Sequence, residues 1–225
     1  NNVYIEGMDL SGWDVSNVIL FISCEEEDNS PFYVAKNGIT IKARDWVSVG
    51  TTAELNGVTY TAVDLASLRE WIEEDKDLSK VVTTKVETPS NSSTAALFLT
   101  TGKEIKGIEG WDVSNWTYMQ GLFYSSYTVN ADLSGWDVSK VTDMILMMRM
   151  GDVNININNW DVSSATDMSS MFMWYSNIEN NVYIEGMDLS GWDVSNVTKC
   201  SGLKTFFDNA NWPESKRPNF LVECD

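Results

Sequence analysis

The tetrapeptide Trp-Asp-Val-Ser occurs five times in the 225 residues, and this repetition constrains the fold more than any other feature of the sequence. The steps between the last four copies are 25, 24 and 32 residues. A period in the twenties with one apolar template is typical of chains whose stacked units cover one another's apolar sides. The sequence therefore predicts a solenoid. The tryptophans of the five copies are Trp13, Trp111, Trp136, Trp160 and Trp192.

The repeat unit is clearest at residues 132–144, which read DLSGWDVSKVTDM, and at residues 188–200, which read DLSGWDVSNVTKC. Its apolar positions fit neither a long helix nor a strictly alternating strand. We expect a tight turn followed by a short strand, over residues 141–144 and their equivalents, that stacks in parallel on its neighbours. The expected core residues are Trp111, Val113, Leu133, Trp136, Val138, Val141, Met144, Trp160, Val162, Met168, Leu189, Trp192, Val194 and Val197.

The polar residues of each copy are expected to stabilise the turn by hydrogen bonds to backbone amides, as short polar side chains do. The alternative for the row of aspartates is calcium binding, because stacked carboxylates favour a hard cation. The glycine-rich spacing of calcium-binding β-rolls is missing from the sequence, so we favour turn bonding and predict neither a metal site nor a cofactor. The turn residues are Asp112, Ser114, Asp137, Ser139, Asp161, Ser163, Asp193 and Ser195.

The signature Asp-Leu-Ser-x-Trp-Asp-Val-Ser-Asn-Val-Thr-Asp-Met-Ser-x-Met-Phe resembles the BspA-like leucine-rich repeats of bacterial surface proteins over roughly residues 85–200. The resemblance implies an α/β to mainly β fold, a leucine-rich-repeat-like solenoid with short parallel strands over residues 83–199. It also implies a location at the cell surface and a role in binding or scaffolding.

Residues 32–82 differ in composition from the repeats and predict a small α+β module that caps one end of the solenoid. Asn56-Gly57 between two alternating segments is the signal of a two-residue hairpin turn. Asp64 is placed to cap a helix over residues 65–75. The expected module is therefore a hairpin plus a helix.

Residues 200–225 leave the template and are predicted to form a cap at the other end. The chain has three cysteines. If Cys24 is lipidated, Cys200 and Cys224 remain and can form a disulfide in an oxidising compartment. The alternative is two reduced, buried cysteines, with Cys200 in the place of the repeat methionine.

The segment ILFISC at residues 19–24 is followed by EEED, and together they look like a lipobox with the export signal of a Bacteroidetes surface lipoprotein. Cys24 is the expected site of lipidation, and residues 19–31 are interpreted as this segment plus an acidic tether. Residues 1–18 are identical to residues 180–197 and are interpreted as a duplicated repeat fragment. The other interpretations are an imperfectly assembled chain, or a true extra repeat before a coincidental lipobox.

The composition of the chain argues against several classes of function. The formal net charge is −18, which opposes direct contact with nucleic acid or an anionic membrane, so the membrane is expected to be reached only through a lipid anchor. The chain has no histidine, phosphate-binding loop or nucleophile elbow, so we predict no catalytic residue and no enzyme. The sequence predicts a non-enzymatic adhesion lipoprotein that faces outward from the outer membrane and binds a protein or glycan. The alternative is a structural or accessory subunit of an outer-membrane protein complex.

Two sets of side chains outside the core template are candidates for ligand contact. Asp143 and Asp167 lie in the expected strand and present the same choice between calcium binding and turn hydrogen bonding, and the exposed face of that strand is the favoured binding surface. Aromatic residues form a possible carbohydrate platform, although most of them are expected to pack between coils: Tyr118, Tyr124, Tyr127, Trp174 and Tyr175.

Overall fold

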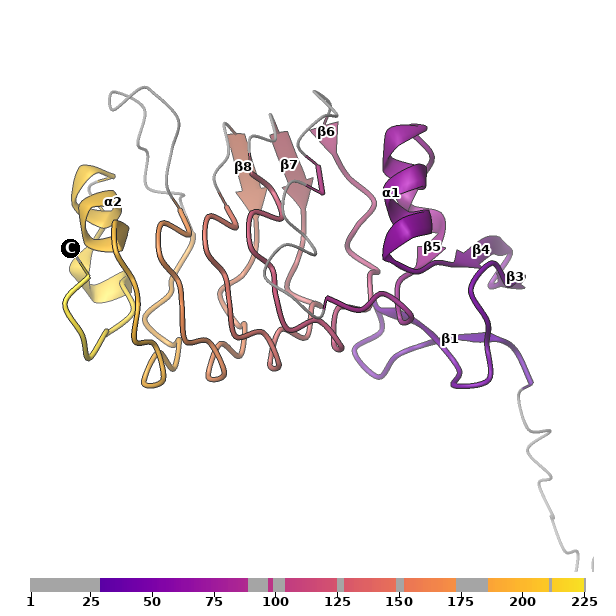
Figure 1. The fold of residues 1–225 in the computed structure, drawn as a ribbon, viewed down its shortest axis with the longest axis horizontal. Helices are drawn as coiled ribbons and strands as arrows, with labels where there is room; N and C mark the ends of the chain where they lie inside the picture. Colours follow the sequence, from indigo (N-terminus) through magenta and orange to yellow (C-terminus); the bar gives the residue numbers. More distant parts are fainter. Residues whose placement is uncertain are drawn as a thin grey trace, which may run out of the picture.

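The computed structural model describes residues 29–88, 97–98, 104–124, 128–148, 152–172, 186–210 and 212–224. An N-terminal module is followed by repeat units that lie side by side, and then by a C-terminal helix (Figure 1). Residues 1–18, the lipobox-like segment at residues 19–24 with Cys24, and the four acidic residues that follow it lie outside the described part. Within that part, no helix has the length and apolar character needed to span a bilayer.

The N-terminal module contains two antiparallel hairpins. Strand β1 (Phe32–Val34) pairs with β2 (Ile41–Ala43), and β3 (Thr52–Leu55) pairs with β4 (Val58–Ala62). The turn predicted at Asn56-Gly57 is present. Both of its residues have positive φ, 54° and 79°, as a two-residue turn of this type requires. A short strand β5 (Val81–Val82) joins β4 in parallel and leads into the repeats.

The predicted helix is α1 (Leu65–Glu73), and it begins with a capping box. The Asp64 carboxylate accepts the Ser67 amide at 2.9 Å, and the Ser67 hydroxyl accepts the Asp64 amide at 3.0 Å. Leu68 and Ile72 on one side of the helix are buried in the main core. A 3₁₀ turn, η1 (Leu78–Lys80), connects the helix to β5.

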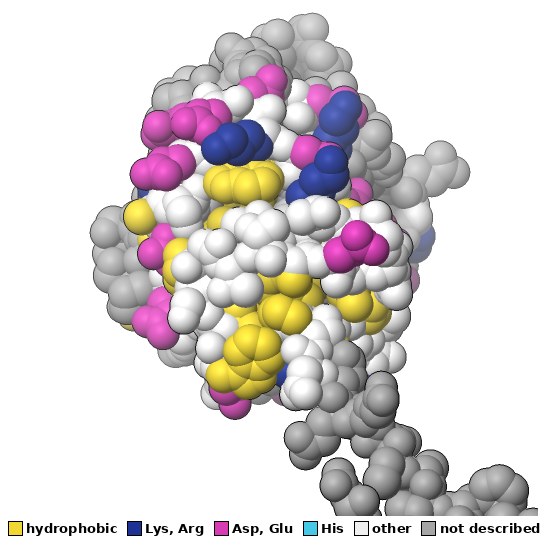
Figure 2. All heavy atoms as spheres, turned by 90° about the vertical axis from the view of Figure 1, so that its right-hand side faces the viewer, with side chains coloured by type: hydrophobic (Ala, Val, Ile, Leu, Met, Phe, Trp, Pro, Cys, Tyr) yellow, Lys and Arg dark blue, Asp and Glu magenta, His cyan; other side chains and the backbone are white. Residues whose placement is uncertain are grey.

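The outer end of the module exposes apolar surface. Figure 2 shows hydrophobic side chains gathered on this end, with acidic and basic side chains beside them. The exposed apolar residues of the module include Trp46, which is 60 % exposed, with Val49 and Val58. A single exposed apolar side chain is ordinary, whereas several gathered together are typical of a contact surface.

The predicted leucine-rich-repeat solenoid is wrong, because the described residues form only small, separate sheets. One sheet is the antiparallel pair β1–β2, and the second is the mixed sheet of β3, β4 and β5. The third is a parallel sheet of three short strands, β6 (Glu104–Ile105), β7 (Thr128–Ala131) and β8 (Asp152–Ile155). These strands precede the Trp-Asp-Val-Ser turns, whereas the repeat pattern predicted strands that follow the turns.

The strand expected at residues 141–144 and its equivalents is reduced to isolated parallel bridges. A residue in the left-handed region ends the extended backbone at the same place in each unit. Gly121, Leu146, Ser170 and Gly202 have φ of 60°, 53°, 55° and 79°, and each lies ten residues after a repeat tryptophan. Extended strands need negative φ, so no continuous sheet can propagate through this position.

Two of these four positions, Leu146 and Ser170, hold residues other than glycine, although the left-handed region favours glycine. Replacing Ser170 by glycine is therefore expected to raise stability. A left-handed non-glycine residue costs about 1–2 kcal/mol, and glycine adds about 0.5–1 kcal/mol of unfolded-state entropy. We therefore expect the variant to be more stable by about 0.5–1 kcal/mol in urea denaturation. Ser169→Gly, one residue away and without positive φ, is the matched control and should lower stability. Equal effects at the two positions would contradict the assignment of strain to Ser170.

The C-terminal end is closed by α2 (Leu203–Asn209), which was not predicted as a helix. Leu203, Phe206 and Phe207 are buried, and the ring of Phe206 stacks on that of Phe172 at 5.4 Å. A 3₁₀ turn, η3 (Glu214–Lys216), follows. Cys200 and Cys224, the pair expected from the sequence, are joined by a disulfide.

Candidate functional site

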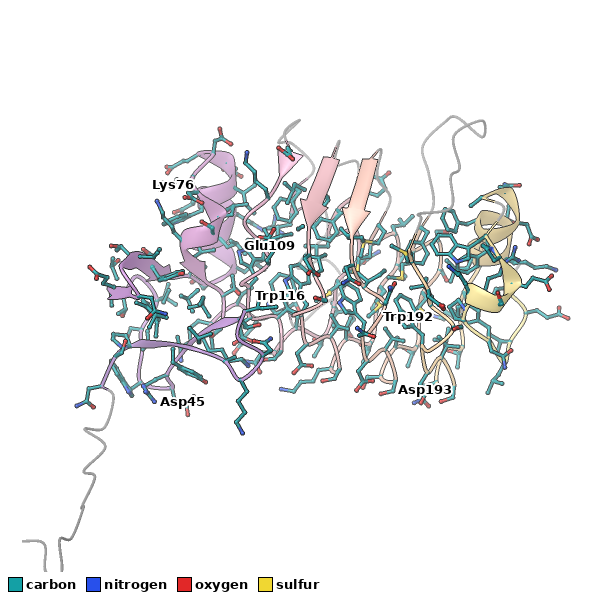
Figure 3. All side chains as sticks on the ribbon, turned by 180° about the vertical axis from the view of Figure 1, so that it is seen from behind. Asp45, Lys76, Glu109, Trp116, Trp192 and Asp193 are labelled. Carbon is teal, nitrogen blue, oxygen red and sulfur yellow. A yellow bond between two sulfur atoms is a disulfide. The ribbon has the colours of Figure 1, made fainter. Side chains whose placement is uncertain are left out.

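A row of stacked tryptophans holds the repeat units in register. The rings of Trp111, Trp136, Trp160 and Trp192 follow one another at 6.3, 6.3 and 6.5 Å, with 5° between successive planes. Figure 3 shows Trp192, the last member of this row, and Trp116 between the backbones of the repeat units, with Asp193 at the outer edge of the units. Stacking fixes the spacing of the units, and this in turn places equivalent side chains beside one another.

Each indole also binds the backbone of the preceding unit. The indole N–H of Trp136 donates to the carbonyl of Ile108 at 2.9 Å, and that of Trp160 donates to the carbonyl of Leu133 at 2.9 Å. The same carbonyls accept the backbone amide of the tryptophan three residues later in their own unit. The tryptophan therefore contributes both buried apolar area and a directional bond between units.

All fourteen expected core residues are buried. They are Trp111, Val113, Leu133, Trp136, Val138, Val141, Met144, Trp160, Val162, Met168, Leu189, Trp192, Val194 and Val197.

The expected turn residues form hydrogen bonds within each unit. In the turns at Asp137 and Asp161, the carboxylate accepts both the amide and the hydroxyl of the serine two residues later, at 3.1 and 2.6 Å. Asp193 accepts the amide of Ser195 at 3.0 Å. Hydrogen bonds from the serines lower the pKa of Asp161 and Asp193. Among the described residues, no group of three or more acidic or cysteine side chains could hold a metal ion.

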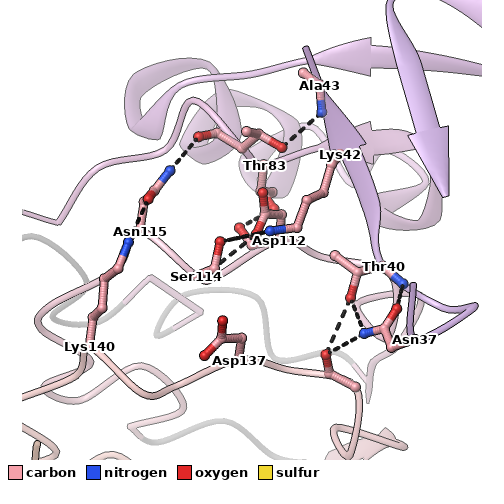
Figure 4. Close-up of polar contacts among 12 residues, drawn as sticks. Asn37, Thr40, Lys42, Ala43, Thr83, Asp112, Ser114, Asn115, Asp137 and Lys140 are labelled. Atoms are coloured by element: carbon pink, nitrogen blue, oxygen red, sulfur yellow. Dashed lines mark hydrogen bonds and ion pairs between the residues drawn. The ribbon is translucent and has the colours of Figure 1, made fainter. Parts of the chain in front are cut away.

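The first turn of this kind differs because it contacts the N-terminal module (Figure 4). Asp112 is buried, and its carboxylate lies 3.2 Å from the ammonium of Lys42, which also donates to the Ser114 hydroxyl at 3.0 Å. Burial acts to raise the pKa of Asp112. The pKa of Asp112 is nevertheless lowered, because burial is outweighed by hydrogen bonds from Ser114 and Thr84 and by the charge of Lys42. This turn therefore joins the module to the repeats.

The best candidate for ligand contact is a row of side chains on the isolated bridges. Parallel bridges join Tyr118 to Asp143, Asp143 to Asp167 and Asp167 to Lys199, and we call these four residues the bridged row. The amides of the residues that follow Tyr118, Asp143 and Asp167 donate to the carbonyl of the next member of the row at 2.8–2.9 Å. Bridge partners on neighbouring strands point to the same side, about 4.8 Å apart, so the four side chains form one line.

Charge within the bridged row is unbalanced. The pKa of Asp143 is raised, mainly because the carboxyl is partly buried and also because the charge of Asp167 lies beside it. The hydrogen bond from the Ile145 amide and the charge of Lys199 act in the opposite direction and offset only part of this rise. The side chain of Asp167 is 13 % exposed, and one of its oxygens lies 3.4 Å from the ammonium of Lys199. Two partly buried carboxylates are thus held side by side with one adjacent cation. Such an arrangement favours an incoming cation or hydrogen-bond donor.

The raised pKa of Asp143 predicts a pH-dependent effect of Asp143→Asn. A carboxyl whose pKa is higher in the folded chain contributes stability that is complete below the unfolded pKa and is lost as the pH rises through the folded value. At neutral pH the variant should be more stable by about 0.5 kcal/mol, the scale of a like-charge cross-strand pair. The gain should vanish near pH 3, about where carboxyls become protonated. Urea denaturation at the two pH values measures it, and a variant that is less stable at neutral pH would contradict it.

Three of the four residues in the bridged row are among the candidates expected from the sequence. Asp143 and Asp167 were expected in one set and Tyr118 in another, whereas the structure brings all three together. Lys199 was missed, although it occupies the same template position, seven residues after a repeat tryptophan. Tyr124 is not part of the row. Tyr127, Trp174 and Tyr175 lie outside the described residues.

Comparisons with known proteins give a family but no close relative. No curated protein matches the chain, and no solved structure matches it. A family model described as "Mycoplasma protein of unknown function, DUF285" matches residues 92–216, which is more than half of the sequence. The match covers the four consecutive Trp-Asp-Val-Ser units and α2. The chain therefore belongs to the DUF285 family.

Proposed function

We propose that this chain is the binding part of a non-enzymatic cell-surface lipoprotein, and that it holds an extracellular protein or glycan against the bridged row. The observation that carries the proposal is the pair of partly buried carboxylates, Asp143 and Asp167, on adjacent units. Like charges held side by side lower stability, although each carboxylate also accepts a backbone amide at 3.0 Å, Asp143 from Ile145 and Asp167 from Ser169. Functional sites are where such local conflicts concentrate.

The chemistry of the bridged row defines what it can bind. Two carboxylates supply several acceptor sites, and an ionised carboxylate accepts N–H and O–H groups more strongly than a neutral acceptor does. Tyr118 adds an aromatic ring beside them. The suitable ligand therefore presents sugar hydroxyls or basic side chains. A net charge of −18 would also attract a basic ligand over a distance.

The proposed surface location is supported by residues in two regions. Cys24 follows an apolar run and precedes four acidic residues, an arrangement that resembles an exported lipoprotein. The disulfide between Cys200 and Cys224 suits an oxidising compartment. The likeness of the repeat signature to BspA-like surface proteins also supports a location at the cell surface.

The lipoprotein assignment is tested by metabolic labelling with palmitate. The label should enter the native chain and should not enter Cys24→Ala. Label in neither chain would overturn the lipoprotein assignment.

Binding is tested with the fluorescently labelled chain on a glycan array and on intact bacterial and animal cells. The wild-type chain should bind a subset of these surfaces. Asp143→Asn with Asp167→Asn should weaken that binding by about tenfold or more, since each lost charged hydrogen bond is worth about 1.5–3 kcal/mol. Asp45→Asn removes one exposed acid from the module and should leave binding unchanged. Equal binding by all three chains would exclude the bridged row as the contact surface.

A second candidate function is an accessory subunit of an outer-membrane protein complex. The exposed Trp46 with Val49 and Val58 on the outer end of the module favours it, since aromatic residues are enriched in protein interfaces. Stoichiometric co-purification with a membrane complex, lost in Trp46→Ser, would support this function. Purification of the native protein as a free monomer would argue against it.

A further inference from the structure

A cavity at the C-terminal end uses none of the residues of the bridged row. It has a volume of about 360 Å³ and lies between α2 and the segment that follows η3. Phe207, Phe220 and Val222 give it an apolar lining. Lys204 and Arg217 bring two cations to the same space, against the carboxylate of Glu223 in the lining and that of Asp208, which pairs with Arg217.

One wall of the cavity is tied to α2 through Cys224. The disulfide ties Cys224 to Cys200, and the amide of Lys204 donates to the carbonyl of Cys224 at 3.3 Å. These two links hold the last residues of the chain against α2. These links lower the cost in affinity of ordering that wall around a ligand.

Arg217 is the most constrained residue in the lining. Its guanidinium donates to the carbonyls of Trp212 and Phe207 at 2.8 and 3.2 Å and pairs with Asp208 at 2.6 Å. It also lies over the ring of Phe207, 5.8 Å from the centroid. Three of its five N–H groups are used in these bonds, so the fixed guanidinium can still donate toward the cavity.

We infer that this cavity binds a small apolar anion. The apolar part would pack on Phe207, Phe220 and Val222, and the anionic group would be held by Lys204 and Arg217. A volume of about 360 Å³ falls within the range of pockets for small molecules, about 300–1,000 Å³, and such pockets combine apolar walls with a few convergent polar groups. In a chain with 33 acidic and 15 basic residues, two cations converging on one apolar cavity set this region apart.

The test uses anilinonaphthalenesulfonate, a fluorescent apolar anion, with the full oxidised chain. Titration should show one saturable site. N-phenylnaphthylamine, which keeps the aromatic part without the sulfonate, should bind at least about tenfold more weakly, because it lacks the charged contacts. Equal affinity for the two probes would overturn the assignment to anions.

Variants of the lining residues test whether the anion binds in this cavity. Lys204→Gln should weaken binding of the anion by about tenfold, the usual scale for one lost charged contact. Lys140→Gln removes the same charge from a repeat unit outside the cavity and should have no effect. Val222→Trp fills the cavity from a partly exposed position and should abolish binding without unfolding the chain. Binding that is unchanged in both Lys204→Gln and Val222→Trp, or no saturable binding to the wild-type chain, would overturn the inference.

Discussion

Replacing Trp136 by alanine is expected to lower the free energy of unfolding by about 3–5 kcal/mol, the cost of removing a large aromatic side chain from a packed core. Trp136 is buried, it stacks between Trp111 and Trp160, and its indole N–H binds the carbonyl of Ile108. The substitution would therefore interrupt the row at its centre. Urea denaturation followed by circular dichroism measures the loss.

The matched control is Trp46→Ala in the N-terminal module. Trp46 is 60 % exposed, so its removal should change stability by no more than about 0.5 kcal/mol. Domains of this kind have total stabilities of about 5–15 kcal/mol, so the loss at Trp136 should be visible as a large shift in the midpoint. Similar losses at the two positions would show that the tryptophan row does not hold the units together.

Removing the disulfide should have the second largest effect. The double variant Cys200→Ser with Cys224→Ser is expected to lose about 2–4 kcal/mol, because the bridge closes a loop across 24 positions and restricts the unfolded chain. Thermal unfolding in the absence of reductant measures the difference. Adding dithiothreitol should lower the stability of the wild-type chain to that of the variant and leave the variant unchanged. A wild-type midpoint that does not respond to reductant would contradict the account.

The repeat period and the core positions could be predicted from the sequence, because burial imposes the same apolar template on every unit. The division of the strands into small, separate sheets could not be predicted. The backbone turns at Leu146 and Ser170 into the left-handed region, and neither residue type signals this conformation as glycine does. Without that information, the apolar spacing was compatible with a continuous sheet of short strands.

The candidate site was only partly predictable for a different reason. Asp143 and Asp167 share a template position, so the sequence alone placed them in one row. The pairing of Lys42 with Asp112 joins residues from the module and the first turn, and no periodic pattern connects them. The cavity beside α2 likewise depends on how residues after η3 return to the helix, which follows from tertiary packing and the disulfide.

In the proposed function, the two neighbouring carboxylates of the bridged row serve a ligand. The most direct test measures unfolding and surface binding together, on the chain that carries both Asp143→Asn and Asp167→Asn. We expect stability at neutral pH to be kept or raised, while binding to the surfaces recognised by the wild-type chain falls by about tenfold or more. A variant that loses stability but binds as the wild-type chain does would show that the pair is structural and would contradict the claim.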